Sequence, residues 1–267
     1  MRELNDKWAA GRTYEAFMGR WSRLLAPRFV SWLSVRPAAN WLDVGCGTGA
    51  LADAICAGAN PASVIACDPS EPFIEYASRD QVDTRVLFVV GGIGPLPTRP
   101  GGFDSVTSLL ALNFFPKPED ALEEMRRITV ADGVVSACVW DYAGRMEFLR
   151  SFWDSAAALD TRAAELDEGR RFPICRPGAL KSLFRKRGLA GVVCDAIEIP
   201  TRFPTFADFW MPFAGGTGPA PSYVASLDPA RREALAKRLE RSLPRESDGT
   251  ISLVAKAWVV RGVVCSR

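Results

Sequence analysis

Apolar residues in the first half of the chain follow two alternating spacings. Short uninterrupted apolar runs, typical of buried strands, predict strands over 41–44, 63–67, 86–90, 104–109 and 133–140. Between these runs, apolar residues recur three or four positions apart and predict helices over 13–34, 50–56, 70–77 and 118–129. Strands that alternate with helices favour a parallel sheet with helices on both faces. The pattern therefore predicts a doubly wound α/β fold.

The second half of the chain has a looser pattern. Apolar and aromatic residues at helical spacing predict helices within 144–175 and over 177–187 and 228–243, and further strands are predicted over 191–199 and 251–260. Residues 203–220 combine aromatic residues with Pro and Gly, and we interpret them as a cap or loop. With the two late strands, the sheet is predicted to be seven-stranded and mostly parallel, with a helical lid.

The composition is that of a globular chain. Its 267 residues, 48% of them apolar and 24% charged, suit one sizeable α/β domain. A net charge of +2 without a basic run gives no electrostatic footprint for nucleic acid. The sequence shows neither an apolar signal region nor a membrane-spanning apolar stretch. Seven cysteines without paired spacing disfavour disulfides and a zinc site. Together, these features lead us to expect a cytoplasmic protein that binds no membrane and no metal.

The chain contains no histidine. This absence removes the usual general base, the Ser-His-Asp and Cys-His pairs, and the imidazole ligands of metal sites. Hydrolase and metalloenzyme functions are therefore disfavoured.

The segment 43–49, Asp-Val-Gly-Cys-Gly-Thr-Gly, follows a predicted strand and opens a predicted helix. Glycines there permit a tight turn and the close approach of a ligand, while the helix start offers unsatisfied N–H groups. Asp68 ends the second strand, 25 residues after Asp43, where a carboxylate can accept from both hydroxyls of a ribose. An ordinary strand-to-helix turn explains the glycines but not the acid, so the pattern favours a nucleotide-containing cofactor.

Two cofactor classes fit this turn. Segment 45–50 matches a loose G-x-G-x-x-A, so an NAD(P)-dependent oxidoreductase remains an alternative. Asp43 stands two residues before the first glycine, where its charge would repel a pyrophosphate but favour an ammonium group. No Lys-Tyr or His pair for hydride chemistry follows.

Residues 41–49 resemble motif I of the class I S-adenosylmethionine-dependent methyltransferases, which have a Rossmann-like fold. The resemblance continues through 66–70, 103–106, 112–118 and the helix over 118–128, which is similar to that of the small-molecule branch. It covers residues 41–141. It implies one domain over 1–267, with an N-terminal helical lid (1–36), a cofactor-binding core (41–141) and substrate-side cap segments (142–190 and 201–250).

The resemblance also implies how S-adenosylmethionine is held. Asp43 would hold the methionine ammonium through water, Asp68 would bind the ribose hydroxyls, and backbone groups near the methionine and ribose would come from Gly45, Cys46 and Gly47. The adenine contacts would come from Pro69, Ser70, Gly92, Ile93 and the carbonyl of Leu109. Many relatives carry an acid where this chain has Gly92, and this departure calls into question the usual contact to the adenine amino group.

Segment 14–23 resembles an N-terminal lid of some relatives, in which Tyr14 and Arg20 would reach the cofactor carboxylate. Arginine suits a carboxylate because its fork can bond both oxygens. The alternative is that Tyr14 belongs to the helix core and that Arg20 is solvated.

Methyl transfer is an in-line displacement that needs no acid, and positioning alone can supply about 7–11 kcal/mol, so it tolerates the absence of histidine. The acceptor pocket is expected beyond the strand ends. It would be lined by Asn113, Trp140, Phe152, Trp153 and Trp210, with Asp141 or Tyr142 as the catalytic candidate if a base is needed. The alternatives are core packing for the aromatic residues and a turn role for Asp141.

The sequence thus predicts a methyltransferase that acts on a small molecule, as a monomer or homodimer, without nucleic acid. The Leu-Ala-Leu-Asn of 110–113 stands where nucleic-acid methyltransferases carry an N/D-P-P-Y/F motif. A chain that binds the cofactor without transferring a methyl group is the other alternative, alongside the oxidoreductase.

Overall fold

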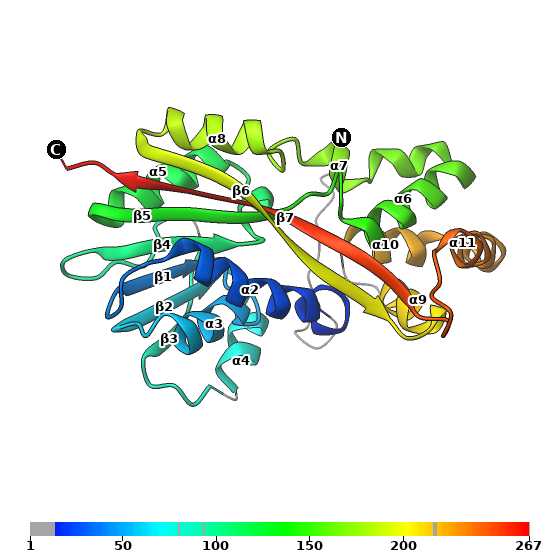
Figure 1. Cartoon of the computed structure of the whole chain (residues 1–267), viewed down its shortest axis with the longest axis horizontal. Helices are drawn as coiled ribbons and strands as arrows, with labels where there is room; N and C mark the ends of the chain where they lie inside the picture. The colour runs from blue at the N-terminus through cyan, green and yellow to red at the C-terminus, as the bar shows by residue number, and fades with distance from the viewer. Residues whose placement is uncertain (1–13, 80, 93, 216–217, 267) are drawn as a thin grey trace. The chain divides into compact units, whose positions relative to one another are not determined.

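The computed structural model describes residues 14–79, 81–92, 94–215 and 218–266 (Figure 1). The chain divides into two compact units. Unit 1 comprises the segment that ends at Met18, Asp141–Pro173 and Glu198–Lys256. Unit 2 comprises Gly19–Trp140, Ile174–Ile197 and the segment that begins at Ala257.

A seven-stranded sheet in the order β3-β2-β1-β4-β5-β7-β6 runs through the structure. Its strands are β1 (Asn40–Val44), β2 (Ser63–Asp68), β3 (Val86–Val90), β4 (Phe103–Leu109), β5 (Thr129–Trp140), β6 (Leu189–Phe203) and β7 (Ile251–Val264). All pairs among β1 to β5 are parallel, whereas β7 is antiparallel to β5. The prediction of a seven-stranded, mostly parallel α/β sheet is confirmed.

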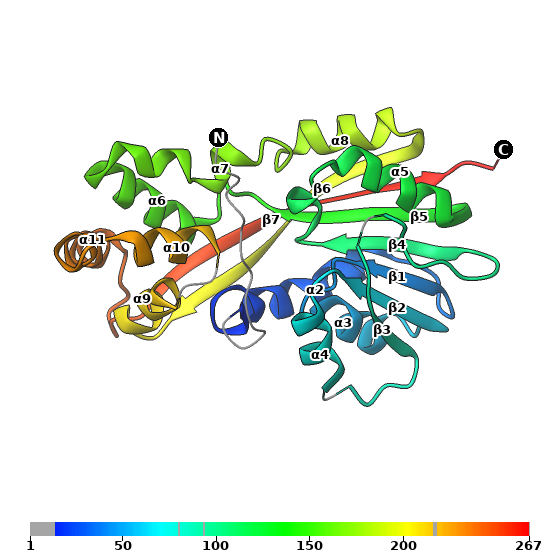
Figure 2. The same ribbon diagram turned by 180° about the vertical axis from the view of Figure 1, so that it is seen from behind.

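Helices cover both faces of the unit 2 sheet. They are α2 (Arg20–Leu33), α3 (Ala50–Gly58), α4 (Glu71–Arg79), α5 (Pro118–Ile128) and α8 (Pro177–Lys186). Helix α2 packs on α3, α4 contacts β2 and β3, and α5 contacts β4 and β5. Figure 1 shows α2 on the near face, and Figure 2, from behind, shows α5 on the opposite face. Because strands β1, β2 and β4 are parallel neighbours, their carboxyl ends lie at one edge of the sheet.

Unit 1 is largely helical. It contains α6 (Glu147–Leu159), η3 (Thr161–Glu165), α7 (Glu168–Arg171), α9 (Phe206–Ala214), α10 (Pro219–Ser226) and α11 (Pro229–Ser242). The short π-helical turn η1 (Glu15–Gly19) begins in this unit. The loop alternative for residues 203–220 is wrong, because most of this segment is helical, whereas its role as a cap stays a prediction. The reason is a capping box: the Thr205 side chain accepts from Asp208 N, and the Asp208 carboxylate accepts from Thr205 N.

Aromatic rings form the core of unit 1. Phe152 and Phe213 are stacked, with centroids 4.5 Å apart and planes 5° apart, and Phe148 meets Phe213 at 6.3 Å. The fully buried rings are those of Phe148, Phe152, Trp153, Phe203, Phe209 and Phe213. These contacts explain the run of aromatic residues in the second half of the chain. In the part of the chain that the structure describes, no helix combines the length and apolar character needed to span a bilayer.

Candidate cofactor site

The glycine turn between β1 and α3 is fixed to the end of β2. The backbone N–H groups of Gly45 and Cys46 both donate to the carbonyl oxygen of Cys67, at 2.8 and 3.0 Å. In the parallel register of β1 and β2, Val44 is the partner of Cys67. The turn therefore lies directly over the carboxyl ends of two adjacent strands.

Two glycines of this turn differ in their surroundings. Gly45 has φ +75°, and a Cβ atom on it would stand 2.5 Å from Ala111 Cβ, because the segment after β4 packs on the turn. Gly47 has φ +51°, and a Cβ atom there would meet no atom within 4 Å. Gly45 thus serves close packing, whereas Gly47 presents its backbone to open space, where a ligand can approach.

Asp68, at the end of β2, connects the turn to the following loop. Its carboxylate accepts from Gly47 N through Oδ2 and from Ser70 N through Oδ1, each at 2.9 Å. Burial raises the pKa of Asp68, and the two backbone hydrogen bonds oppose that shift. A carboxylate oxygen has two acceptor sites, so each oxygen can still accept from one hydroxyl of a diol.

Asp43 is fully buried beside this turn. Neither of its carboxylate oxygens has a hydrogen-bond partner among the described residues. Burial raises the pKa of Asp43 well above its usual value, and the charges of Asp68 and Asp53 raise it further. A buried carboxylate without a partner is costly unless a cation approaches it, so this position suits the ammonium group of a ligand.

The comparison with known families indicates which class of ligand the glycine turn resembles a site for. Residues 42–137 match the family model described as "Methyltransferase domain". This segment of the chain is therefore similar to a methyltransferase domain. The match begins in β1 and ends in β5, so it includes the glycine turn and Asp68.

Curated proteins are similar to this chain over part of their length. A demethylmenaquinone methyltransferase of Paenarthrobacter aurescens is 30% identical over 131 residues, which are 49% of this chain and 46% of the relative. A malonyl-[acyl-carrier protein] O-methyltransferase of Erwinia pyrifoliae is 28% identical over 163 residues, 61% of this chain and 56% of the relative. The chain spans about half the length of the curated relatives it matches.

Solved structures share the fold over nearly the whole chain. A putative methyltransferase from an antibiotic biosynthesis pathway of Anabaena variabilis superposes with a TM-score of 0.60 at 18% identity, covering 89% of this chain and 98% of its own. A phosphoethanolamine N-methyltransferase of Haemonchus contortus gives a TM-score of 0.58 at 14% identity, covering 96% of this chain and 57% of its own. At these identities the similarity shows the fold alone.

The structure places most of the predicted adenine residues near Asp68. Gly91 N donates to the Asp68 backbone carbonyl at 3.0 Å, and a Cβ atom on Gly92 would lie 3.8 Å from Pro69 Cβ. Leu109 ends β4 and is followed by Leu110, whose φ of +61° is unusual for a side chain that large. Predicted residue Ile93 lies outside the described residues. The binding roles of these groups stay predictions.

The predicted lid residues belong to different units of the chain. Tyr14 lies in the segment of unit 1 that ends at Met18, whereas Arg20 lies in unit 2. The guanidinium carbon of Arg20 stands 4.3 Å from the centre of the Trp21 ring, a cation–π contact. A role of either residue in holding the cofactor stays a prediction.

The predicted acceptor residues are also divided between the units. Asn113 and Trp140 belong to unit 2, and Phe152, Trp153 and Trp210 belong to unit 1. Asn113 is buried, and neither atom of its amide has a hydrogen-bond partner in the described ranges. Phe152 and Trp153 are fully buried in the aromatic core, so each of them packs as a core residue within its unit.

The two catalytic candidates lie directly after β5. The Asp141 carboxylate accepts from Arg145 N at 3.1 Å and pairs with Lys256 Nζ at 2.8 Å. These contacts serve the turn that follows the strand. Tyr142 is buried, with its ring 5.8 Å from that of Phe172. Whether either residue acts on an acceptor stays a prediction.

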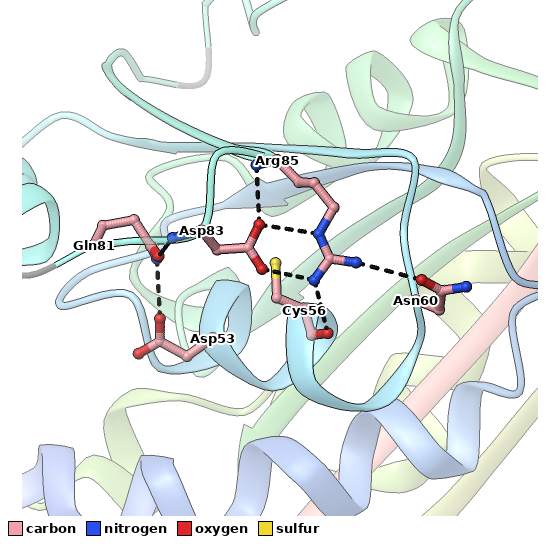
Figure 3. Close-up of polar contacts among 6 residues, drawn as sticks. All are labelled: Asp53, Cys56, Asn60, Gln81, Asp83 and Arg85. Atoms are coloured by element: carbon pink, nitrogen blue, oxygen red, sulfur yellow. Dashed lines mark hydrogen bonds and ion pairs between the residues drawn. The ribbon is translucent and has the colours of Figure 1, made fainter.

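A polar network outside the predicted site fixes the far end of α3 (Figure 3). The Arg85 guanidinium bonds both oxygens of Asp83 and donates to the Cys56 carbonyl at 3.3 Å. Asn60 accepts from the same guanidinium at 3.4 Å. The bond to Cys56 satisfies a carbonyl near the C-terminus of the helix that begins at the glycine turn. Arg85 therefore stabilises α3 at the end remote from the glycine turn.

Glu168 is a buried acid that the sequence did not single out. Its carboxylate accepts from Trp153 Nε1, and burial raises the pKa of Glu168 to about 7. It begins the segment Glu168–Arg171, whose one acidic and two basic residues are typical of a solvated surface. Only the tertiary structure shows that this carboxyl is enclosed.

Proposed function

We propose that the chain transfers a methyl group from S-adenosylmethionine to a small-molecule acceptor by in-line displacement. The observation that carries the proposal is the buried, partnerless carboxylate of Asp43 beside a glycine turn whose Gly47 faces open space. A dinucleotide would bring a pyrophosphate to this turn and meet like charge. Relatives named for methylation of demethylmenaquinone and of malonyl-[acyl-carrier protein] support a non-nucleic-acid acceptor.

The residues present fit the cofactor. Asp43 would neutralise the ammonium of the methionine portion, directly or through water. Backbone groups of Gly45, Cys46 and Gly47 would line the methionine and ribose, and Asp68 would accept from the ribose hydroxyls. The adenine would lie among Pro69, Ser70, Gly92, Ile93 and the Leu109 carbonyl, with Tyr14 and Arg20 at the cofactor carboxylate. The bound cofactor supplies an activated methyl group on a cationic leaving group, so the chain needs no acid.

The work of the chain in this proposal is to position the acceptor and to exclude water. Asn113 has a free amide donor and acceptor in a buried position, which suits hydrogen bonding to a polar group of the acceptor. Within unit 2, the residues proposed to contact the acceptor are Asn113 and Trp140. Asp141 would act as base only after exchanging its contact with Lys256, and Tyr142 is the other candidate.

The cellular setting belongs to the same proposal. We expect the chain to act in the cytoplasm as a monomer or homodimer, apart from nucleic acid and membranes. The near-neutral balance of 33 basic and 31 acidic residues supports the absence of a nucleic-acid partner.

Calorimetric titration of the purified chain with S-adenosylmethionine, S-adenosylhomocysteine and NAD tests the proposal. We expect dissociation constants on the order of micromolar for the first two ligands and no heat for NAD. Binding of NAD alone would make the oxidoreductase the correct alternative. Cofactor binding without turnover of any acceptor in a broad screen would favour a chain that binds the cofactor without transfer.

Replacement of Asp68 is expected to weaken S-adenosylmethionine binding by about a hundredfold. The Asp68→Ala variant loses acceptors for the ribose hydroxyls and for the N–H groups of Gly47 and Ser70, and bonds to a charged group contribute about 1.5–3 kcal/mol each. The measurement is the same titration, with circular dichroism to check folding. Asp53→Asn is the control, since Asp53 is half-exposed on α3; equal affinities of the two variants would place the ribose elsewhere.

A further inference from the structure

A cavity of about 290 Å³ lies within unit 1. It is bounded by the end of α6, the start of η3, α10 and α11. Helix α6 packs against η3, α10 and α11, and both ribbon views draw α10 and α11 beside α6 (Figures 1 and 2). Its volume is near the lower end of the range for small-molecule pockets, about 300 Å³. None of its lining residues belongs to the cofactor residues.

The wall of this cavity is partly apolar and partly polar. Among its apolar and aromatic residues, Leu235 and Tyr223 are buried, whereas Leu159, at the end of α6, is 50% exposed. Apolar surface that remains in contact with water is a source of binding free energy, about 25 cal/mol for each Å² covered. The cavity therefore favours a ligand with an apolar body.

Tyr223 lines the cavity and carries a polar hydroxyl group. The Tyr223 ring is only 8% exposed and is held by Phe152 and Trp153, with ring centroids 6.3 and 5.9 Å away. Its hydroxyl makes no hydrogen bond to any residue in the described part of the chain. Burial and the Asp160 carboxylate raise the pKa of Tyr223, so the hydroxyl is neutral and can donate.

Two guanidinium groups line the cavity. Arg162 uses Nε and Nη2 to bond Asp160, each at 3.2 Å, and Arg231 places Nε 3.4 Å from Asp228. Arg162, Arg231 and Asp228 are exposed and Asp160 is partly buried, so both pairs are in contact with water and contribute little. An arginine has five N–H donors, which leaves donors on both residues for a further anion. Because Asp160 and Asp228 offset the two guanidinium charges, an anion bound here depends on the remaining N–H donors, and phosphate, which has no apolar part to cover the wall, is disfavoured.

We propose that this cavity binds a small aromatic carboxylate, with its ring between Leu159, Leu235 and Tyr223 and its carboxylate held by the Tyr223 hydroxyl, Arg162 and Arg231. The carboxylate completes the hydrogen bonding of the tyrosine, and the ring covers the apolar wall. The site is independent of the proposed methyl transfer, because every residue that forms it belongs to unit 1 and none is a proposed cofactor residue.

The probes are indole-3-acetate, its neutral isostere indole-3-acetamide, and inorganic phosphate, each titrated calorimetrically into the full chain. We expect indole-3-acetate to bind with a submillimolar dissociation constant, the amide to bind at least about tenfold more weakly, and phosphate not to bind. Absence of indole-3-acetate binding overturns the proposal. Equal affinities of the acid and the amide also overturn it, since the guanidinium groups would then contribute nothing.

Variants distinguish this cavity from any other site for the probe. Ala234→Trp, at an exposed position of α11 that lines the cavity, is expected to abolish indole-3-acetate binding, and Tyr223→Phe and Arg231→Gln to weaken it about five- to tenfold. Lys237→Gln, on the same helix but outside the cavity, is the matched control and should bind normally. Unchanged binding by Ala234→Trp contradicts the proposal. S-adenosylmethionine titrations of the same variants should be unchanged, which separates this outcome from a failure of the proposed function.

Discussion

Replacement of Asp43 by asparagine is expected to lower the affinity for S-adenosylmethionine by about a hundredfold, equivalent to about 3 kcal/mol. The side chain keeps its size and its buried place in β1, so the change removes charge and little else. In the unsubstituted chain, the carboxylate has no protein partner and would be neutralised by the ammonium of the cofactor. Asp104→Asn is the control, because Asp104 is an acid on a neighbouring strand whose carboxylate bonds Arg36 and Asn40 instead. Equal titration curves for Asp43→Asn and the unsubstituted chain would contradict the assignment.

The same substitution is expected to change how stability depends on pH. The pKa of Asp43 is raised in the folded chain, so the folded state binds more protons than the unfolded state above pH of about 4. The contribution of Asp43 to the free energy of unfolding is therefore fully present below the pKa that Asp43 has in the unfolded chain. It is lost as the pH rises through the pKa that Asp43 has in the folded chain. Asp43→Asn should remove this loss and unfold at higher urea concentration than the unsubstituted chain at pH 8. Glu168, whose pKa is raised to about 7, contributes equally to both chains, so the comparison isolates Asp43.

Replacement of Gly45 by alanine is expected to destabilise the chain by roughly 2–5 kcal/mol and to abolish cofactor binding. A Cβ atom would stand 2.5 Å from Ala111 Cβ, and φ of +75° is strained for alanine. The left-handed conformation costs about 1–2 kcal/mol, and overpacking typically adds 1–3 kcal/mol. Urea unfolding and the cofactor titration measure the two effects.

Gly47→Ala is the matched comparison for Gly45→Ala. Its Cβ atom meets nothing within 4 Å, so we expect only the conformational cost, together with loss of cofactor binding as the methyl group occupies the ligand's space. The double variant Gly45→Ala, Ala111→Gly should recover the packing part of the lost stability but not the φ strain. Equal destabilisation by Gly45→Ala and Gly47→Ala would show that contact with Ala111 does not govern the turn.

The elements of unit 2 could be predicted because their signals are local. Each strand of the parallel part is a short apolar run in the sequence, and residues 43–49 directly predict the glycine turn. The late strands were harder: β6 and β7 extend over Leu189–Phe203 and Ile251–Val264, beyond the predicted 191–199 and 251–260. Their burial alternates along the strand, so their polar positions obscured the ends. The helix α9 was missed because Pro and Gly near its end outweighed the capping signal at Thr205.

The residues of the candidate site, too, could be predicted only in part from the sequence. Asp43 and Asp68 could be predicted because their chain positions relative to the strands fix their place at the sheet edge. The buried amide of Asn113 could be named, but its lack of partners is a tertiary property. Aromatic residues such as Phe152 and Trp153 recur at the same helical spacing whether they line a pocket or fill a core, so sequence alone left both interpretations open. Glu168 gave no signal because enclosure of a carboxyl depends on segments distant in the chain.

The antiparallel pairing of β7 with β5 sets a limit on how far this chain can be shortened. The segment matched by the methyltransferase family model ends at residue 137, yet Val134–Trp140 of β5 pair with Val263–Ala257 of β7. A minimal fragment that stopped there would keep every glycine of the turn but would leave a long apolar strand with open backbone groups along one side. Such an edge recruits other chains, so the fragment would be expected to form aggregates rather than a small cofactor-binding module. Co-expression with a separate peptide spanning residues 251–264 would be the natural means of closing that edge.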